Sequence, residues 1–131
     1  MNSERVFFSR RFWALAAALW TTGVIALAVS PEMESSWVMK NISDKILHGL
    51  AFTVGAIIWT KTAEGGDSRK VGTAMASGAF ASLLVGGVIE ILQRWVPRRS
   101  SDIWDFVAVM AGVLVALAII GAIRLAKPTR S

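Results

Sequence analysis

Four long stretches without a charged side chain dominate the pattern of this chain. They cover residues 12–29, 46–60, 71–89 and 106–123. A helix rises about 1.5 Å per residue, so roughly 20 residues cross a hydrocarbon core of about 30 Å. The second stretch is the shortest, but Lys45 and Lys61 at its ends can extend their ammonium groups to the membrane surface. The pattern predicts an all-α fold, a four-helix transmembrane bundle.

Proline, glycine and charged residues predict where these helices end. Pro31 prevents simple continuation of the first helix, and Pro97 marks a turn between the third and the fourth. Residues 63–68 have the composition of a flexible loop. The predicted organisation is a basic N-terminal arm at 1–11, a four-helix membrane domain at 12–123 and a basic tail at 124–131.

The first apolar stretch has two interpretations. Arg10 and Arg11 precede it, and Ala26-Leu27-Ala28 resembles the cleavage site of a secretory signal peptide. Its apolar region is longer than that of most cleaved signals, which favours a retained helix. Cleavage would leave the orientation of the other helices unchanged.

Composition and charge agree with a membrane protein. Hydrophobic residues make up 54% of the 131 residues, and the mean hydropathy is +0.55, more than a soluble core of this size requires. With a cytoplasmic N-terminus, nine of the 14 Lys and Arg residues lie on the inner side, as the positive-inside bias requires. Both termini are therefore expected in the cytoplasm, and the net charge of +5 needs no nucleic-acid partner. The absence of cysteine excludes disulfides, thiolate chemistry and sulfur-ligated zinc.

Glu90 directly follows the third uncharged stretch. A carboxylate where a helix meets its membrane boundary requires partners, so Glu90 is a candidate site residue. Every fourth residue before it is small, and these residues are Gly86, Ser82, Gly78 and Ala74. Small residues at this spacing let membrane helices approach closely. We therefore expect Glu90 to face a neighbouring helix, not lipid.

Polar groups from three helices are predicted to meet on one side of the membrane. In an alternating topology the start of the second helix, the end of the third and the start of the fourth share a side, here the outer one. Asp44 and His48, four residues apart, also share a helical face. The sequence predicts an outward-facing polar pocket. Its candidate ligand-binding residues are Asp44, His48, Glu90, Gln93, Arg98, Arg99, Asp102 and Asp105.

The order of these motifs resembles the VanZ-like family of small bacterial membrane proteins. The family pattern is Asp-Lys-x-x-His, Glu-x-x-Gln and Arg-Ser-x-Asp-x-x-Asp, followed by Asn and Gly. The resemblance covers residues 44–123, and the first helix matches only in its hydrophobicity. The matching segments are Asp44-Lys45-Ile46-Leu47-His48, Glu90-Ile91-Leu92-Gln93 and Pro97-Arg98-Arg99-Ser100-Ser101-Asp102-Ile103-Trp104-Asp105, with Gly112 further on.

The resemblance implies a multi-pass protein of the bacterial cytoplasmic (inner) membrane. It connects the chain with cell-envelope processes or with resistance to the glycopeptide antibiotic teicoplanin, and it supplies no reaction. One position departs from the pattern, because Val109 stands where family members often carry Asn. This departure removes a polar partner beside Asp105 and puts in doubt any mechanism that needs the amide.

The acidic and imidazole candidates each have a functional and a structural interpretation. His48, the single histidine, is either a proton carrier oriented by Asp44 or a hydrogen-bonding group between helices. A divalent metal held by His48, Glu90 and Asp105 is chemically feasible, but the spacing has no ligand signature, so no metal or cofactor is predicted. Asp102 is expected to cap the fourth helix and Asp105 to point inward.

The remaining candidates also have two interpretations each. Glu90 and Gln93 form either a base with its orienting amide, or an ion-pairing group for the arginines that follow. Arg98 and Arg99 bind either a lipid phosphate or pyrophosphate, whose oxygens suit the guanidinium fork, or ordinary phospholipid headgroups.

Three functions follow from the sequence. The first is a protein that binds the phosphate-bearing head group of a lipid-linked envelope precursor or of an amphiphilic antibiotic. The second is an enzyme acting on such a lipid, with His48, Glu90 and Asp105 as catalytic candidates. The third is a structural membrane subunit whose polar cluster only locks helix packing. Membrane lipids are partners in every case, and the sequence leaves the oligomeric state open.

Overall fold

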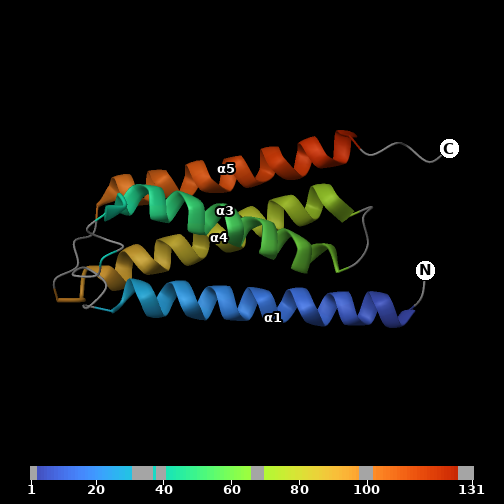
Figure 1. Cartoon of the computed structure of the whole chain (residues 1–131), viewed down its shortest axis with the longest axis horizontal. Helices are drawn as coiled ribbons and strands as arrows, with labels where there is room; N and C mark the ends of the chain where they lie inside the picture. Colours follow the sequence, from blue (N-terminus) through green and yellow to red (C-terminus); the bar gives the residue numbers. More distant parts are fainter. Residues whose placement is uncertain (1–2, 31–36, 38–40, 66–69, 98–101, 127–131) are drawn as a thin grey trace.

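The computed structural model describes residues 3–30, 37, 41–65, 70–97 and 102–126. Its long helices run roughly antiparallel along one axis (Figure 1), so the predicted all-α four-helix bundle is confirmed. The helices are α1 (Ser3–Ala28), α3 (Asp44–Glu64), α4 (Val71–Gln93) and α5 (Ile103–Ala126).

All four helices are long and apolar enough to cross a membrane. Even α3, which contains the shortest uncharged stretch, has 21 residues and so a length of about 30 Å. Large apolar side chains cover the outside of the bundle: Leu19 is 74% exposed, Phe80 69% and Leu114 66%. In a bilayer these side chains contact acyl chains, as expected of a multi-pass membrane protein.

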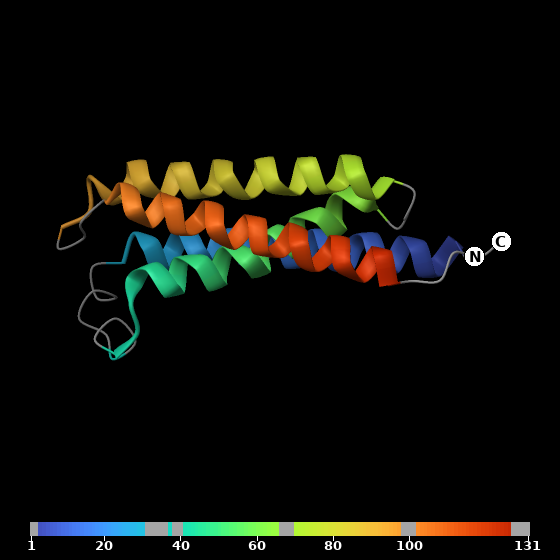
Figure 2. The same cartoon turned by 90° about the horizontal axis from the view of Figure 1, so that it is seen from above.

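The helices α3 and α4 lie between α1 and α5 (Figure 1), and the view from above shows the same lengthwise alignment (Figure 2). The helix α3 packs against each of the other three. At one end of the bundle α1 and α4 end while α3 and α5 begin. We call this the site end, defined by Asp44, Gln93 and Asp105. The other end, defined by Glu64 and Arg124, is the far end.

The predicted ladder of small residues is the buried face of α4. It comprises Ala74, Gly78, Ser82 and Gly86. A Cβ atom at Gly78 would come within 2.7 Å of the backbone nitrogen of Thr60, so only glycine permits this approach of α4 to α3. A helical turn has 3.6 residues, so positions spaced by four rotate gradually around the helix axis. Toward the end of α4 the buried face therefore passes to Ile89 and Gln93. Glu90 consequently lies at the edge of the buried face and is partly buried.

Backbone contact also joins α3 to α5. A Cβ atom at Gly112 would clash with the carbonyl oxygen of Gly49 and lie 3.1 Å from its carbonyl carbon. The hydroxyl of Thr53 donates to the carbonyl oxygens of both glycines, at 2.8 Å to Gly49 and 3.0 Å to Gly112. One turn before Gly112, Val109 is 1% exposed and packs in a cluster with Phe52. Val109, which stands where the VanZ-like pattern has Asn, therefore packs among apolar side chains.

Several helix ends differ from those expected. The helix α1 begins within the stretch expected to be a basic arm, and α4 ends at Gln93, before the turn predicted at Pro97. The loop predicted at 63–68 begins later, because α3 continues through Glu64 and ends at Gly65, whose φ of 59° suits glycine. The carboxylate of Glu64 is paired with Arg124 of α5, and this pairing holds the last turn of α3 in place.

Candidate functional site

The first turn of α3 fixes the orientation of His48. Its Nδ1 atom lies 2.8 Å from the carbonyl oxygen of Asp44 and 3.4 Å from the carboxylate oxygen Oδ1 of the same residue. A carbonyl oxygen only accepts hydrogen bonds, so Nδ1 carries the proton and donates it. In the neutral ring the lone pair then resides on Nε2.

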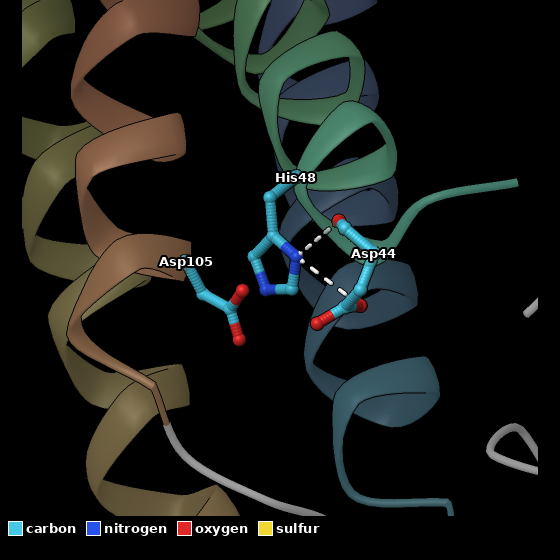
Figure 3. A group of neighbouring side chains, drawn as sticks. All are labelled: Asp44, His48 and Asp105. Carbon is cyan, nitrogen blue, oxygen red and sulfur yellow. Dashed lines mark hydrogen bonds and ion pairs between the residues drawn. The ribbon is translucent and has the colours of Figure 1, made fainter.

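Asp105 reaches His48 from α5. Its side chain is 3% exposed, which confirms that it points inward. The imidazole ring lies between Asp44 and Asp105, and its second nitrogen points toward Asp105 (Figure 3). The three residues each offer one donor atom, and these atoms lie within 4.8 Å of one another. We call Asp44, His48 and Asp105 the triad.

Lys45 supplies a positive charge beside the triad. Its Nζ atom lies 3.5 Å from Asp102 Oδ2 and 3.6 Å from Asp105 Oδ1. The lysine side chain is 50% exposed, whereas Oδ1 of Asp105 is fully shielded and accepts no hydrogen bond from the described part of the chain. Sequence reasoning assigned Lys45 only to the membrane surface, although its place directly after Asp44 already sets it at this level.

The neighbouring carboxylate of Asp102 has a different role from that of Asp105. Its Oδ1 atom accepts a hydrogen bond of 3.0 Å from the backbone N–H of Trp104, so it caps the start of α5 as predicted. The two aspartates of this motif therefore divide into a cap, Asp102, and a buried group, Asp105.

The two polar residues at the end of α4 have different surroundings. One carboxylate oxygen of Glu90 is fully shielded, which agrees with its predicted position against a neighbouring helix. Gln93 is 2% exposed and its amide donates to the carbonyl oxygen of Ala28 at 3.4 Å. It thus ties α4 to α1, and its amide donor is engaged away from Glu90.

Arg98 and Arg99, the predicted phosphate-binding residues, lie outside the described residues. The nearest described cation on that side of the turn is Arg94, which is exposed at the end of α4. Phosphate recognition by the two arginines stays a prediction, as does the outward-facing pocket.

Sequence reasoning missed a buried acid at the far end. Glu64 is 7% exposed, is paired with Arg124 and has Lys61 at 3.6 Å. The available signal was the spacing of three between Lys61 and Glu64, together with an arginine at the end of the last apolar stretch. Because the buried carboxylate of Glu64 is compensated by cations, and Arg124 comes from α5, the pairing forms a structural clamp between α3 and α5.

The triad has the composition of an acid–base or cation-binding site. Two carboxylates and an imidazole lone pair face one another in a largely buried place, and a proton or a cation between them relieves their mutual repulsion. In comparisons with known proteins, no family model, curated protein or solved structure matches the chain. The VanZ-like resemblance therefore rests on the sequence motifs alone.

Proposed function

We propose that this chain is a membrane protein of the bacterial cell envelope that binds the phosphate-bearing head group of an amphiphile at the site end. The amphiphile is a lipid-linked envelope precursor or an amphiphilic antibiotic. The observation that carries the proposal is the convergence of Asp44, Lys45, His48 and Asp105 from α3 and α5 where the bundle meets the membrane boundary. Polar groups at this depth are costly, which favours a functional use.

Two features support an amphiphile as the ligand. The groups lie in the first turns of α3 and α5, at the ends of two candidate membrane spans, so a ligand anchored by its own acyl or prenyl chain would reach them without leaving the bilayer. Lys45 is half exposed, and Arg98 and Arg99 follow α4 in the sequence, so cations are available to phosphate oxygens. The VanZ-like motifs support the link to the cell envelope and to resistance of the teicoplanin type.

A second candidate function is acid–base catalysis on the same amphiphile. It is favoured by the orientation of His48, whose Nδ1 donates to Asp44 and whose other nitrogen points toward Asp105 (Figure 3). This is how a general base is held with its lone pair directed. Turnover of a candidate lipid by the purified protein would support the enzyme, and saturable binding without turnover would support the binding protein.

Native mass spectrometry of lipids retained by the purified chain tests the proposal. The expected result is selective retention of phosphate monoester lipids, with loss of retention in His48→Ala and Glu90→Gln at unchanged helicity. The double variant Glu64→Gln with Arg124→Met is the control, because it removes a buried carboxylate at the far end together with its charged partner. Retention that is equal for zwitterionic and phosphate monoester lipids, or equal in all variants, would favour a packing role for the cluster.

A further inference from the structure

We propose that the triad of Asp44, His48 and Asp105 is a binding site for one divalent transition-metal ion. This inference deepens the proposed function and rests on it in one respect: the ion is the group that meets the phosphate of the amphiphile. The ion-binding site itself is argued from the geometry of the triad alone.

The donor set is the first argument. One imidazole nitrogen and two carboxylate oxygens, from two different helices, lie within 4.8 Å of one another. Such mixed nitrogen and oxygen ligands suit ions like Zn²⁺ and Mn²⁺. Around an ion with bonds of about 2.1 Å, neighbouring ligand atoms stand roughly 3–3.5 Å apart, so the widest pair of ligand atoms must close by up to roughly 1.3–1.8 Å. The carboxylate of Asp44, 32% exposed at the start of α3, has room to do so.

The hydrogen bonding of His48 is the second argument. Metal-binding histidines commonly donate their other ring N–H to a backbone carbonyl or a carboxylate, which fixes the tautomer and the ring direction. His48 makes this bond, since Nδ1 lies 2.8 Å from the carbonyl oxygen of Asp44. The remaining nitrogen points toward Asp105 (Figure 3). The ring is therefore already oriented as a ligand.

The third argument is the state of Asp105. Its side chain is 3% exposed, and its Oδ1 atom accepts no hydrogen bond within the described residues. Among these residues, the cation that forms an ion pair with this oxygen is Lys45, at 3.6 Å. The lysine side chain is long and 50% exposed, so it can turn to Asp102 when an ion occupies the triad. Lys45 and the ion thus compete for Asp105.

The charge balance connects the ion with the amphiphile. The described side chains at the site end include the acids Asp44, Glu90, Asp102 and Asp105 and, opposite them, the cations Lys45 and Arg94. The two carboxylates of the triad repel a phosphate that approaches them directly. A divalent ion with three protein ligands neutralises the two carboxylates and keeps a coordination position for a phosphate oxygen.

Titration of the full-length, tag-free chain in detergent with Zn²⁺ or Mn²⁺ alone tests the ion site, by calorimetry for Zn²⁺ and by electron paramagnetic resonance for Mn²⁺. The expected result is one ion per chain. Asp105→Asn should weaken binding at least about 100-fold, since loss even of an outer partner of a metal ligand costs 10–100-fold. The double variant Glu64→Gln with Arg124→Met, which removes a carboxylate and its charged partner at the far end, should bind as the unaltered chain does. Absence of stoichiometric binding, or equal binding by Asp105→Asn, would overturn the inference.

Lys45→Met provides a test that does not depend on a buried substitution. Lys45 is half exposed, so this variant should fold, and removal of the competing charge should strengthen ion binding several-fold. Unchanged or weaker binding would contradict the competition between Lys45 and the ion. Circular dichroism confirms the fold of each variant.

A separate measurement distinguishes the ion site from the proposed function. Retention of dioleoyl phosphatidic acid is compared with and without EDTA, with dioleoyl phosphatidylcholine as the reference lipid. Retention that needs the ion supports both proposals. Ion binding without selective retention refutes the proposed function and leaves the ion site standing. Selective retention that persists in EDTA and in Asp105→Asn, with no ion bound, refutes the ion site and leaves the proposed function standing.

Discussion

Replacing Gly112 with alanine is expected to push α5 away from α3 and to destabilise the bundle. The added Cβ atom would clash with the carbonyl oxygen of Gly49 and lie 3.1 Å from its carbonyl carbon and 3.2 Å from its Cα atom. These are backbone atoms of a helix, which cannot turn aside as a side chain can. The two helices must therefore separate, by roughly 1 Å to restore ordinary contact distances.

The magnitude of the effect follows from three contributions. Overpacking of a filled interior costs about 1–3 kcal/mol. The hydrogen bond of 3.0 Å from Thr53 to the carbonyl oxygen of Gly112 is stretched, and such bonds between membrane helices contribute about 0.6 kcal/mol. Alanine regains about 1 kcal/mol of helix propensity. The free energy of unfolding of Gly112→Ala should fall by about 0.5–2.5 kcal/mol.

Unfolding in mixed micelles with increasing SDS, followed by circular dichroism, measures this difference. Two matched variants control for the change from glycine to alanine. Gly121 of α5 has no atom within 4 Å of an added Cβ, and at Gly49 the nearest atom is the carbonyl oxygen of Ala108 at 3.7 Å. Both controls should be as stable as the unaltered chain or slightly more stable. If Gly112→Ala unfolds at the same SDS fraction as Gly121→Ala, the contact between α3 and α5 is not as tight as described.

Two further substitutions test other contacts between the same helices. Thr53→Val removes the hydroxyl that bridges to Gly112 and should lower the free energy of unfolding by about 0.5–1.5 kcal/mol in the same assay. Thr53→Ser keeps the hydroxyl and should retain most of this stability. Equal loss in both variants would contradict a role for the hydroxyl. Glu64→Gln leaves the cation of Arg124 without its main partner and should lower the free energy of unfolding by about 3–5 kcal/mol. The double variant with Arg124→Met should lose clearly less than the two single variants added together. Strict additivity would show that the pair is not coupled.

The positions of the helices were predictable, because the signal is local. Stretches of uncharged residues report the thickness of the membrane core, and each helix satisfies its own backbone hydrogen bonds. The same local logic identified Asp102 as a cap, since a cap acts within its own first turn. It also identified the small residues of α4 as a packing face, because helical periodicity alone places Gly78, Ser82 and Gly86 on one side.

The choice of partners was not predictable in this way. The sequence predicted that Asp44, His48 and Asp105 share one level of the membrane, because chain direction alternates with each span. It did not predict that Lys45 would approach Asp105, that Gln93 would bond to α1, or that Glu64 would be buried.

The amino-acid pattern by itself therefore determined four helices, their approximate ends and the side on which the polar groups gather. Tertiary structure decided how far each helix is rotated about its axis and which neighbour it meets at each turn. The rotation of a helix and its neighbours depend on contacts between residues that are distant in the sequence, such as Gly49 with Gly112. At this contact the absence of a side chain sets the separation of α3 and α5. That separation brings Asp105 up to His48 and so creates the triad.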